Sequence, residues 1–363
     1  MLKRAGVRLG LLAAIGLTGS AAWAQQSEAD AGFGLRGTLS VSAAGSNAPA
    51  DGSTRVDGGA RLMLYPTWKI SSHWTVVGAY QAVARPYYLT DYETPGHGVR
   101  GNLTQGYLSY SKVWKDASLV AKAGELTSVF GAFPLRYDDR DNPMVGIPQQ
   151  YGYYGAMATL GALAGAEVDG TWKRLDARAQ FTNSSPANPR SIFAKEQYGN
   201  WAGGAGFTIR QGLRVGISGY RGPYVDRTYP FYFPAEGRPR SMPGNAIGLE
   251  VQWARGHWNT RGEWQKFEMT YGTFPTFHEH TGYGEVQRSL GPRWYVASRM
   301  GYVGADYAGR VESIEVVAGY RPGAHQIVKL SYETKFYNDG EPQENSVAIQ
   351  FVTALPSLSF TRR

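Results

Sequence analysis

Short segments in which hydrophobic and polar residues alternate recur along most of the chain, and this period of two predicts β-strands. In the first segment, Phe33, Leu35 and Val41 share one face, and polar residues occupy the other. In the last, Val347, Ile349 and Phe351 alternate with small or polar residues in the same way. Sixteen segments follow this pattern: 33–43, 60–70, 74–87, 103–114, 119–126, 165–172, 175–182, 201–210, 213–221, 245–254, 258–269, 281–290, 294–303, 313–320, 326–336 and 347–355.

The connections between these segments alternate between short turns and long polar loops. Turns such as 71–73 and 173–174 are two or three residues long, whereas loops such as 88–102 and 222–244 are much longer. A transmembrane barrel has this alternation, because tight turns face the periplasm and long loops face the exterior. Segments of this length also suit the ~9–11 residues that cross a bilayer when tilted. The sequence therefore predicts an all-β fold, a closed antiparallel transmembrane barrel of about sixteen strands, which leaves no unpaired strand edge in lipid.

Tryptophan supports this interpretation. Seven tryptophans lie at or near the ends of the predicted strands, most of them beside a short turn: Trp68, Trp74, Trp114, Trp172, Trp201, Trp258 and Trp294. An amphipathic ring is stable at the membrane–water boundary, where one side is wet and the other apolar. The alternative is that they form the core of a soluble β-sandwich.

One stretch, 127–155, interrupts the strand pattern. It is rich in proline and glycine, and a structureless insert of this length is usually functional. We expect it to fold into the lumen as a constriction; the alternative is a loop on the rim with solvated charges. Its charges form a cluster that is either paired locally or directed across the bore, and we expect partial pairing with one arginine free: Arg136, Asp138, Asp139, Arg140 and Asp141.

The polar faces of the strands would line the lumen, which in a sixteen-strand barrel holds water. Their basic residues are Arg61, Lys69, Arg85, Lys122, Arg178, Arg210, Arg214, Arg261, Arg299, Lys329 and Lys335. Their acidic residues are Glu167, Asp169, Asp176, Glu250, Glu263, Glu315 and Glu333. An excess of arginine and lysine favours anions, so a weak anion preference follows. The alternative is that these charges pair across neighbouring strands and hold the wall together.

The first 24 residues have the parts of an export signal. Lys3, Arg4 and Arg8 precede the apolar run 9–17, and an A-x-A cleavage site ends at Ala24. Removing them leaves 34 Lys and Arg (37 minus 3) against 29 Asp and Glu, a net charge of +5 for residues 25–363. The chain has no cysteine and no basic patch with interleaved aromatics, so we expect neither disulfides nor nucleic-acid binding.

No catalytic, metal or cofactor motif stands out. His278-Glu279-His280 falls in the predicted loop 270–280, without the H-E-x-x-H spacing of a zinc protease. No G-x-S-x-G motif is present. An outer-membrane enzyme or an adhesin that acts through the loops 222–244 and 270–280 remains the alternative to a channel.

The insert also carries a family resemblance. Gly124-Glu125, Phe130-Gly131, Leu135-Arg136-Tyr137, Asn142-Pro143 and Tyr151-Gly152-Tyr153-Tyr154, on a sixteen-strand pattern, resemble Gram-negative general and phosphate-selective porins. The resemblance implies a third loop folded inward as an eyelet, a homotrimer in outer-membrane lipid, and passive diffusion of small hydrophilic solutes or anions. The dense lysine ladder of the phosphate-selective type is absent, so the resemblance does not extend to phosphate specificity.

Overall fold

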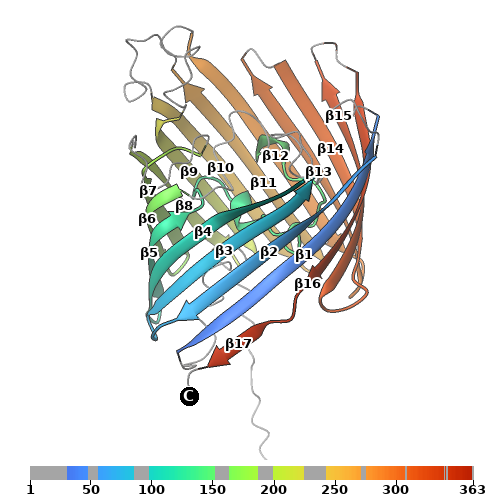
Figure 1. The fold of residues 1–363 in the computed structure, drawn as a ribbon. Coiled ribbons are helices and arrows are strands. Elements are labelled where there is room, and N and C mark those ends of the chain that lie inside the picture. Colours follow the sequence, from blue (N-terminus) through green and yellow to red (C-terminus); the bar gives the residue numbers. More distant parts are fainter. Residues whose placement is uncertain are drawn as a thin grey trace, which may run out of the picture.

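Long antiparallel strands make up most of the structure (Figure 1). The computed structural model describes residues 31–47, 56–85, 98–151, 163–186, 199–224, 243–270, 275–306, 309–338, 340 and 342–361. The expected export signal, residues 1–24, lies outside this range. The strands are β1 (Gly32–Ser46), β2 (Val56–Lys69), β3 (Trp74–Arg85), β4 (Gly98–Val113), β5 (Ala117–Leu126), β6 (Leu163–Trp172), β7 (Leu175–Thr182), β8 (Asn200–Arg210), β9 (Leu213–Pro223), β10 (Pro243–Arg255), β11 (Trp258–Met269), β12 (Phe277–Ser289), β13 (Trp294–Ala305), β14 (Gly309–Tyr320), β15 (Gln326–Tyr337), β16 (Glu344–Ala354) and β17 (Leu358–Thr361).

The sheet closes on itself through β1. One edge of β1 pairs with β2, and its other edge pairs with β16 at Thr38–Ser46 and with β17 at Gly32–Leu35. Residues 355–357, which include Pro356, separate β16 from β17, so these two strands occupy one position in the wall. The barrel therefore has sixteen strand positions, all antiparallel, as the alternating pattern predicted.

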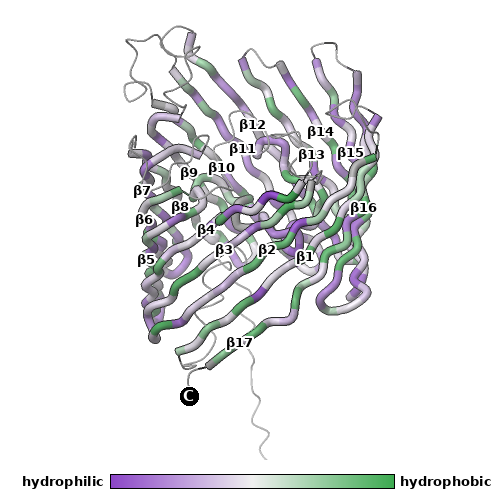
Figure 2. Tube along the Cα trace, in the orientation of Figure 1, coloured by the Kyte–Doolittle hydropathy of each residue, from purple (hydrophilic) through white to green (hydrophobic). Residues whose placement is uncertain are grey.

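Hydropathy alternates along each strand, as Figure 2 shows. In β16, Val347, Ile349 and Phe351 are exposed on the outside, whereas Ala348 and Gln350 are buried on the inside. All seven tryptophans expected at the boundary are exposed: Trp68, Trp74, Trp114, Trp172, Trp201, Trp258 and Trp294. Among the described residues, no helix has the length and hydrophobicity needed to cross a bilayer.

Two predicted loops are shorter than expected. β12 begins at Phe277, so the segment His278-Glu279-His280 is part of a strand and not of a loop. β13 ends at Ala305 and β14 begins at Gly309, so residues 306–308 connect these two strands. His278 and Arg310 are strand residues, and side chains along these strand ends still alternate between the two faces of the sheet. Because both residues are polar, the composition of these strand ends resembled that of loops.

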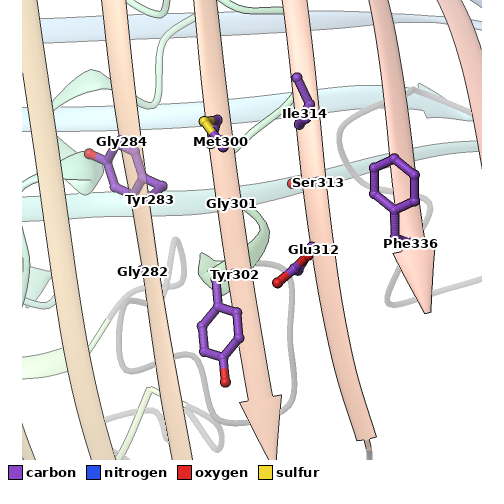
Figure 3. Close-up of a pocket in the computed structure, with 10 residues that line it drawn as sticks. All are labelled: Gly282, Tyr283, Gly284, Met300, Gly301, Tyr302, Glu312, Ser313, Ile314 and Phe336. Atoms are coloured by element: carbon purple, nitrogen blue, oxygen red, sulfur yellow. The ribbon is translucent and has the colours of Figure 1, made fainter. Parts of the chain in front are cut away.

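A groove of about 320 Å³ crosses the outer face of β12–β15 (Figure 3). Gly282 and Gly284 leave it open because they have no side chain, and Met300, Ile314 and Phe336 form its walls. Glu312 is the only ionisable group among its lining residues besides tyrosines. A ligand site needs several converging polar groups, so we assign no site to this groove.

Candidate functional site

The segment Thr127–Tyr151 leaves the wall after β5 and lies inside the barrel, where Figure 1 shows its two short 3-10 helices. These are η1 (Phe133–Arg136) and η2 (Gln149–Tyr151). Its residues bond to side chains of β2, β7, β9 and β11–β15, which lie around much of the circumference. Residues 152–155, the end of the predicted constriction, lie outside the described range.

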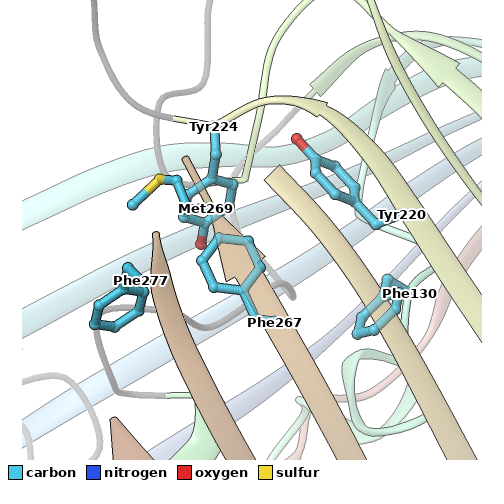
Figure 4. Close-up of a cluster of buried hydrophobic side chains, with 6 residues drawn as sticks. All are labelled: Phe130, Tyr220, Tyr224, Phe267, Met269 and Phe277. Atoms are coloured by element: carbon cyan, nitrogen blue, oxygen red, sulfur yellow. The ribbon is translucent and has the colours of Figure 1, made fainter. Parts of the chain in front are cut away.

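A cluster of aromatic residues fixes the start of this segment. Phe130 is fully buried in a cluster with five other side chains, four from the inner side of β9, β11 and β12 and Tyr224 directly after β9 (Figure 4): Tyr220, Tyr224, Phe267, Met269 and Phe277. Gly131 follows with a φ of 76°, and a Cβ there would lie 2.3 Å from the Tyr151 hydroxyl. Only glycine fits both the conformation and the space. The inner wall is therefore apolar at this point because it packs against the segment and not against water.

Arg136 pairs with the wall and not with its neighbouring aspartates. It donates hydrogen bonds to Glu285 at 2.9 Å and to the Tyr283 hydroxyl at 2.8 Å. Tyr283 in turn donates to Glu263 at 2.8 Å, and the Tyr151 hydroxyl donates to the same carboxylate. Burial opposes the charge, but Tyr283, Glu285 and Glu263 outweigh burial and raise the pKa of Arg136 above its usual value. This arginine anchors η1 and stays charged.

Asp138 and Asp139 also bind the wall, at β2. Asp139 forms an ion pair with Arg61 of β2 at 2.5 Å, and both side chains are fully buried. Arg61 donates a further bond to the Tyr137 carbonyl at 2.9 Å. Asp138 accepts a 2.5 Å hydrogen bond from Tyr65, also on β2. The segment is thus attached to β2 as well as to β11–β15, and Asp139 is held by both Arg61 of β2 and Lys329 of β15.

Arg140 and Asp141 are the exposed charges of the cluster. Arg140 forms no ion pair with any residue that the structure describes, and only its backbone N–H bonds, to Asp138 at 2.9 Å. Although the Asp141 side chain is exposed, the surrounding protein partly desolvates its carboxyl, and this desolvation and Asp138 raise the pKa of Asp141, whereas the charges of Arg140, Arg261 and Arg36 lower it. The charges of three guanidinium groups and of the Asp138 carboxylate therefore act on Asp141.

The charged wall residues make two kinds of contact, and Arg178, Glu285 and Arg299 make both. Those that contact the segment are Arg61, Arg178, Glu263, Arg299, Glu315 and Lys329. Those that pair across strands are Lys122 with Glu167 and Asp169, Arg214 with Asp176 and Glu250, Lys335 with Glu344, and Arg261 with Glu285 at 3.6 Å. Lys335 also lies 3.9 Å from Glu333 on its own strand. Many of the charges expected in the lumen are thus neutralised by a neighbour.

Two residues of the predicted lining lie at the ends of their strands, and the side chain of a third is not described. Arg210 is exposed at the end of β8, beside a register shift between Thr208 and Arg210. Lys69 is half-buried at the end of β2, and the side chain of Arg85 lies outside the described range. Sequence reasoning did not select Arg36 or Glu285. Arg36 could have been found, because it shares the polar face of the first segment.

Neither a metal site nor a catalytic constellation emerges among the described residues. No group of three or more metal-binding side chains forms there. His278 bonds to Asp306 at 3.0 Å on the exposed surface, and His280 lies near the ring of Trp264. Glu279, between them, is buried on the opposite face, so the three residues do not converge.

A closed sixteen-position antiparallel barrel with an inward-folded segment defines a porin-like outer-membrane barrel. Solved structures with this fold include the anion-selective porin from Comamonas acidovorans, with a TM-score of 0.63 and 10% identity, matching 90% of this chain and 100% of that chain. OmpF of Salmonella typhi, solved in complex with daunomycin, has a TM-score of 0.61 and 10% identity over 89% of this chain and 97% of that chain. The trimer form of OmpT, an outer membrane protein of Vibrio cholerae, has a TM-score of 0.57 and 10% identity over 90% and 100%. No protein-family model and no curated protein sequence matches the chain. At this identity the likeness shows the fold alone.

Proposed function

We propose that this protein is an outer-membrane channel for passive diffusion of small hydrophilic solutes, narrowed by the segment 127–155. The observation that carries the proposal is the position of the segment, which bonds to Arg61 and Tyr65 on β2 and to Tyr283, Glu285 and Glu315 on β12 and β14. A segment that lies inside the barrel and bonds to β7, β9, β11–β15 and β2 reduces the open cross-section of the lumen. The predicted export signal at residues 1–24 and the exposed tryptophans support placement in the outer membrane of a Gram-negative bacterium.

The charges at the opening support a weak preference for anions. Arg140 is exposed without an ion-pair partner in the described part of the chain, and Arg36 is exposed on β1. Fixed positive charge at a constriction attracts anions and repels cations. The constriction residues are therefore Arg136, Asp138, Asp139, Arg140 and Asp141, with only Arg140 and Asp141 exposed to a passing solute. The similar OmpT structure is a trimer form, which supports a homotrimer here as well.

Reconstitution into planar lipid bilayers tests the proposal. Insertion of the purified protein is expected to increase the current in steps. In a salt gradient, the sign of the reversal potential is expected to show that anions pass more readily than cations. An enzyme or an adhesin acting through the external loops would give no conductance above that of the bilayer. That silence, in samples shown to be folded by their mobility shift on heating, would overturn the proposal.

A further inference from the structure

A buried lysine on β15 binds the turn at the tip of the inward segment. The Nζ of Lys329 donates hydrogen bonds to the carbonyl oxygens of Asp139 at 2.6 Å, Asn142 at 2.7 Å and Met144 at 3.0 Å. An ammonium group has three donors, so all of its hydrogen-bonding capacity is used on this turn. The side chain of Lys329 is fully buried. Lys329 therefore faces the segment and not the open lumen.

A buried carboxylate on the neighbouring strand binds the donors of the same turn. The Oε1 atom of Glu315 accepts hydrogen bonds from the backbone N–H groups of Val145 and Gly146, each at 3.0 Å. Ser331 of β15 donates to the same oxygen at 2.8 Å. A Cβ at position 146 would lie 3.0 Å from the other carboxylate oxygen, so glycine permits this close approach. Glu315 and Lys329 thus hold opposite polar groups of one turn.

Arg299 on β13 completes the attachment. Its guanidinium donates to the Gly146 carbonyl at 2.8 Å and to the Asn142 side chain at 3.0 Å, and it is paired with Glu285 at 2.7 Å. Within the turn, the Asn142 amide donates to the Gly146 carbonyl at 2.9 Å. A turn without regular secondary structure needs partners for its backbone polar groups. Here charged side chains of three adjacent strands supply them.

We propose that Lys329 and Glu315 are positioning residues that fix the turn 139–146 against the wall and thereby set a constant width of the opening. The inference rests on the proposed channel function and goes beyond it, because it assigns two charges of the expected lining to holding the segment in place instead of selecting ions. The constriction is then a fixed aperture and not a movable gate, since any displacement of the turn breaks five charge-assisted hydrogen bonds at once.

Two substitutions with opposite effects on charge separate positioning from electrostatics. Lys329→Met removes a positive charge and Glu315→Met removes a negative one, and the introduced side chain is the same. If both residues position the turn, both variants admit larger polyethylene glycol molecules than the wild type and show more current fluctuation in planar bilayers. The double variant keeps the net charge and is expected to show the largest exclusion limit.

Lys266→Met on the outer face of β11 is the matched control, because Lys266 pairs with Glu268 and faces away from the lumen. It is expected to keep the wild-type exclusion limit. Lys329→Arg is a milder variant that keeps the charge but cannot direct three donors from one nitrogen, and it is expected to give an intermediate limit. Each sample is first shown to be a folded barrel by its mobility shift on heating.

The outcomes distinguish the two proposals. A wild-type protein without conductance would refute the channel function itself. A conducting wild type whose Lys329→Met, Glu315→Met and Lys329→Arg variants all keep its exclusion limit would refute the positioning role alone. The positioning role would also be refuted if the exclusion limit rose in one methionine variant and fell in the other. Such a result would show that the limit depends on the sign of the removed charge and not on the loss of attachment.

Discussion

Breaking the ion pair between Arg61 and Asp139 is expected to destabilise the barrel strongly. The two side chains lie 2.5 Å apart and are 0% and 1% exposed. Arg61 also lies 4.5 Å from the Tyr137 ring centroid and donates to the Tyr137 carbonyl. Asp139→Ala leaves the guanidinium buried without its counter-charge, and such losses typically cost about 3–5 kcal/mol. Arg61→Met leaves Asp139 in the same position and is expected to cost a similar amount.

The double variant isolates the interaction. Because Arg61→Met combined with Asp139→Ala leaves no unpaired charge, its loss is expected to be smaller than the sum of the two single losses by about 2–3 kcal/mol, near the upper end of measured pair couplings. Urea-induced unfolding of the refolded protein in lipid vesicles, followed by tryptophan fluorescence, gives the free energies. If the losses in free energy of unfolding were additive, or if each single variant lost less than about 1 kcal/mol as exposed pairs do, the pair would not be shielded from water and the reasoning would be refuted.

Three further predictions concern the opening and the attachment of the segment. Arg140→Glu changes the local charge by two, so the reversal potential in a salt gradient should shift in the direction that indicates greater cation permeability. An unchanged reversal potential would place Arg140 away from the solute path. Because the pKa of Asp141 is raised, it binds a proton at a higher pH than an ordinary aspartate, so anion preference should rise as the pH falls through that pKa; Asp141→Asn should lack this component of the pH profile. Phe130→Ala should lower the free energy of unfolding by about 3–5 kcal/mol, since it empties a packed site, whereas Phe181→Ala on the outer face should cost less; equal losses would contradict the role of the cluster.

The strands could be predicted because lipid outside and polar groups inside impose the period of two on every wall residue. Val347, Ile349 and Phe351 in β16 are an example, and their outward position was predicted and is confirmed. The limits of β12 and β14 could not be predicted in this way. His278 and Arg310 lie on exposed strand ends, where polar residues are compatible with a strand or a loop.

The partners of the segment could not be predicted, because pairing depends on the closed barrel. Arg136 has three aspartates within five residues, yet it pairs with Glu285, 149 residues away. Lys329 was expected in the lumen from its face of the strand, and that face was correct. The turn 139–146 covers that face of β15. This contact depends on the tertiary structure, so the sequence of β15 itself does not indicate it.

Comparing the single-channel conductance of the wild-type protein with that of a variant lacking residues 136–142 tests the central claim most directly. The account predicts stepwise conductance for both proteins and a larger step for the deletion variant, because the deletion removes the residues that bond to β2 and β12. A wild type that never conducts, or a deletion variant with an unchanged step, would contradict a water-filled lumen narrowed by this segment.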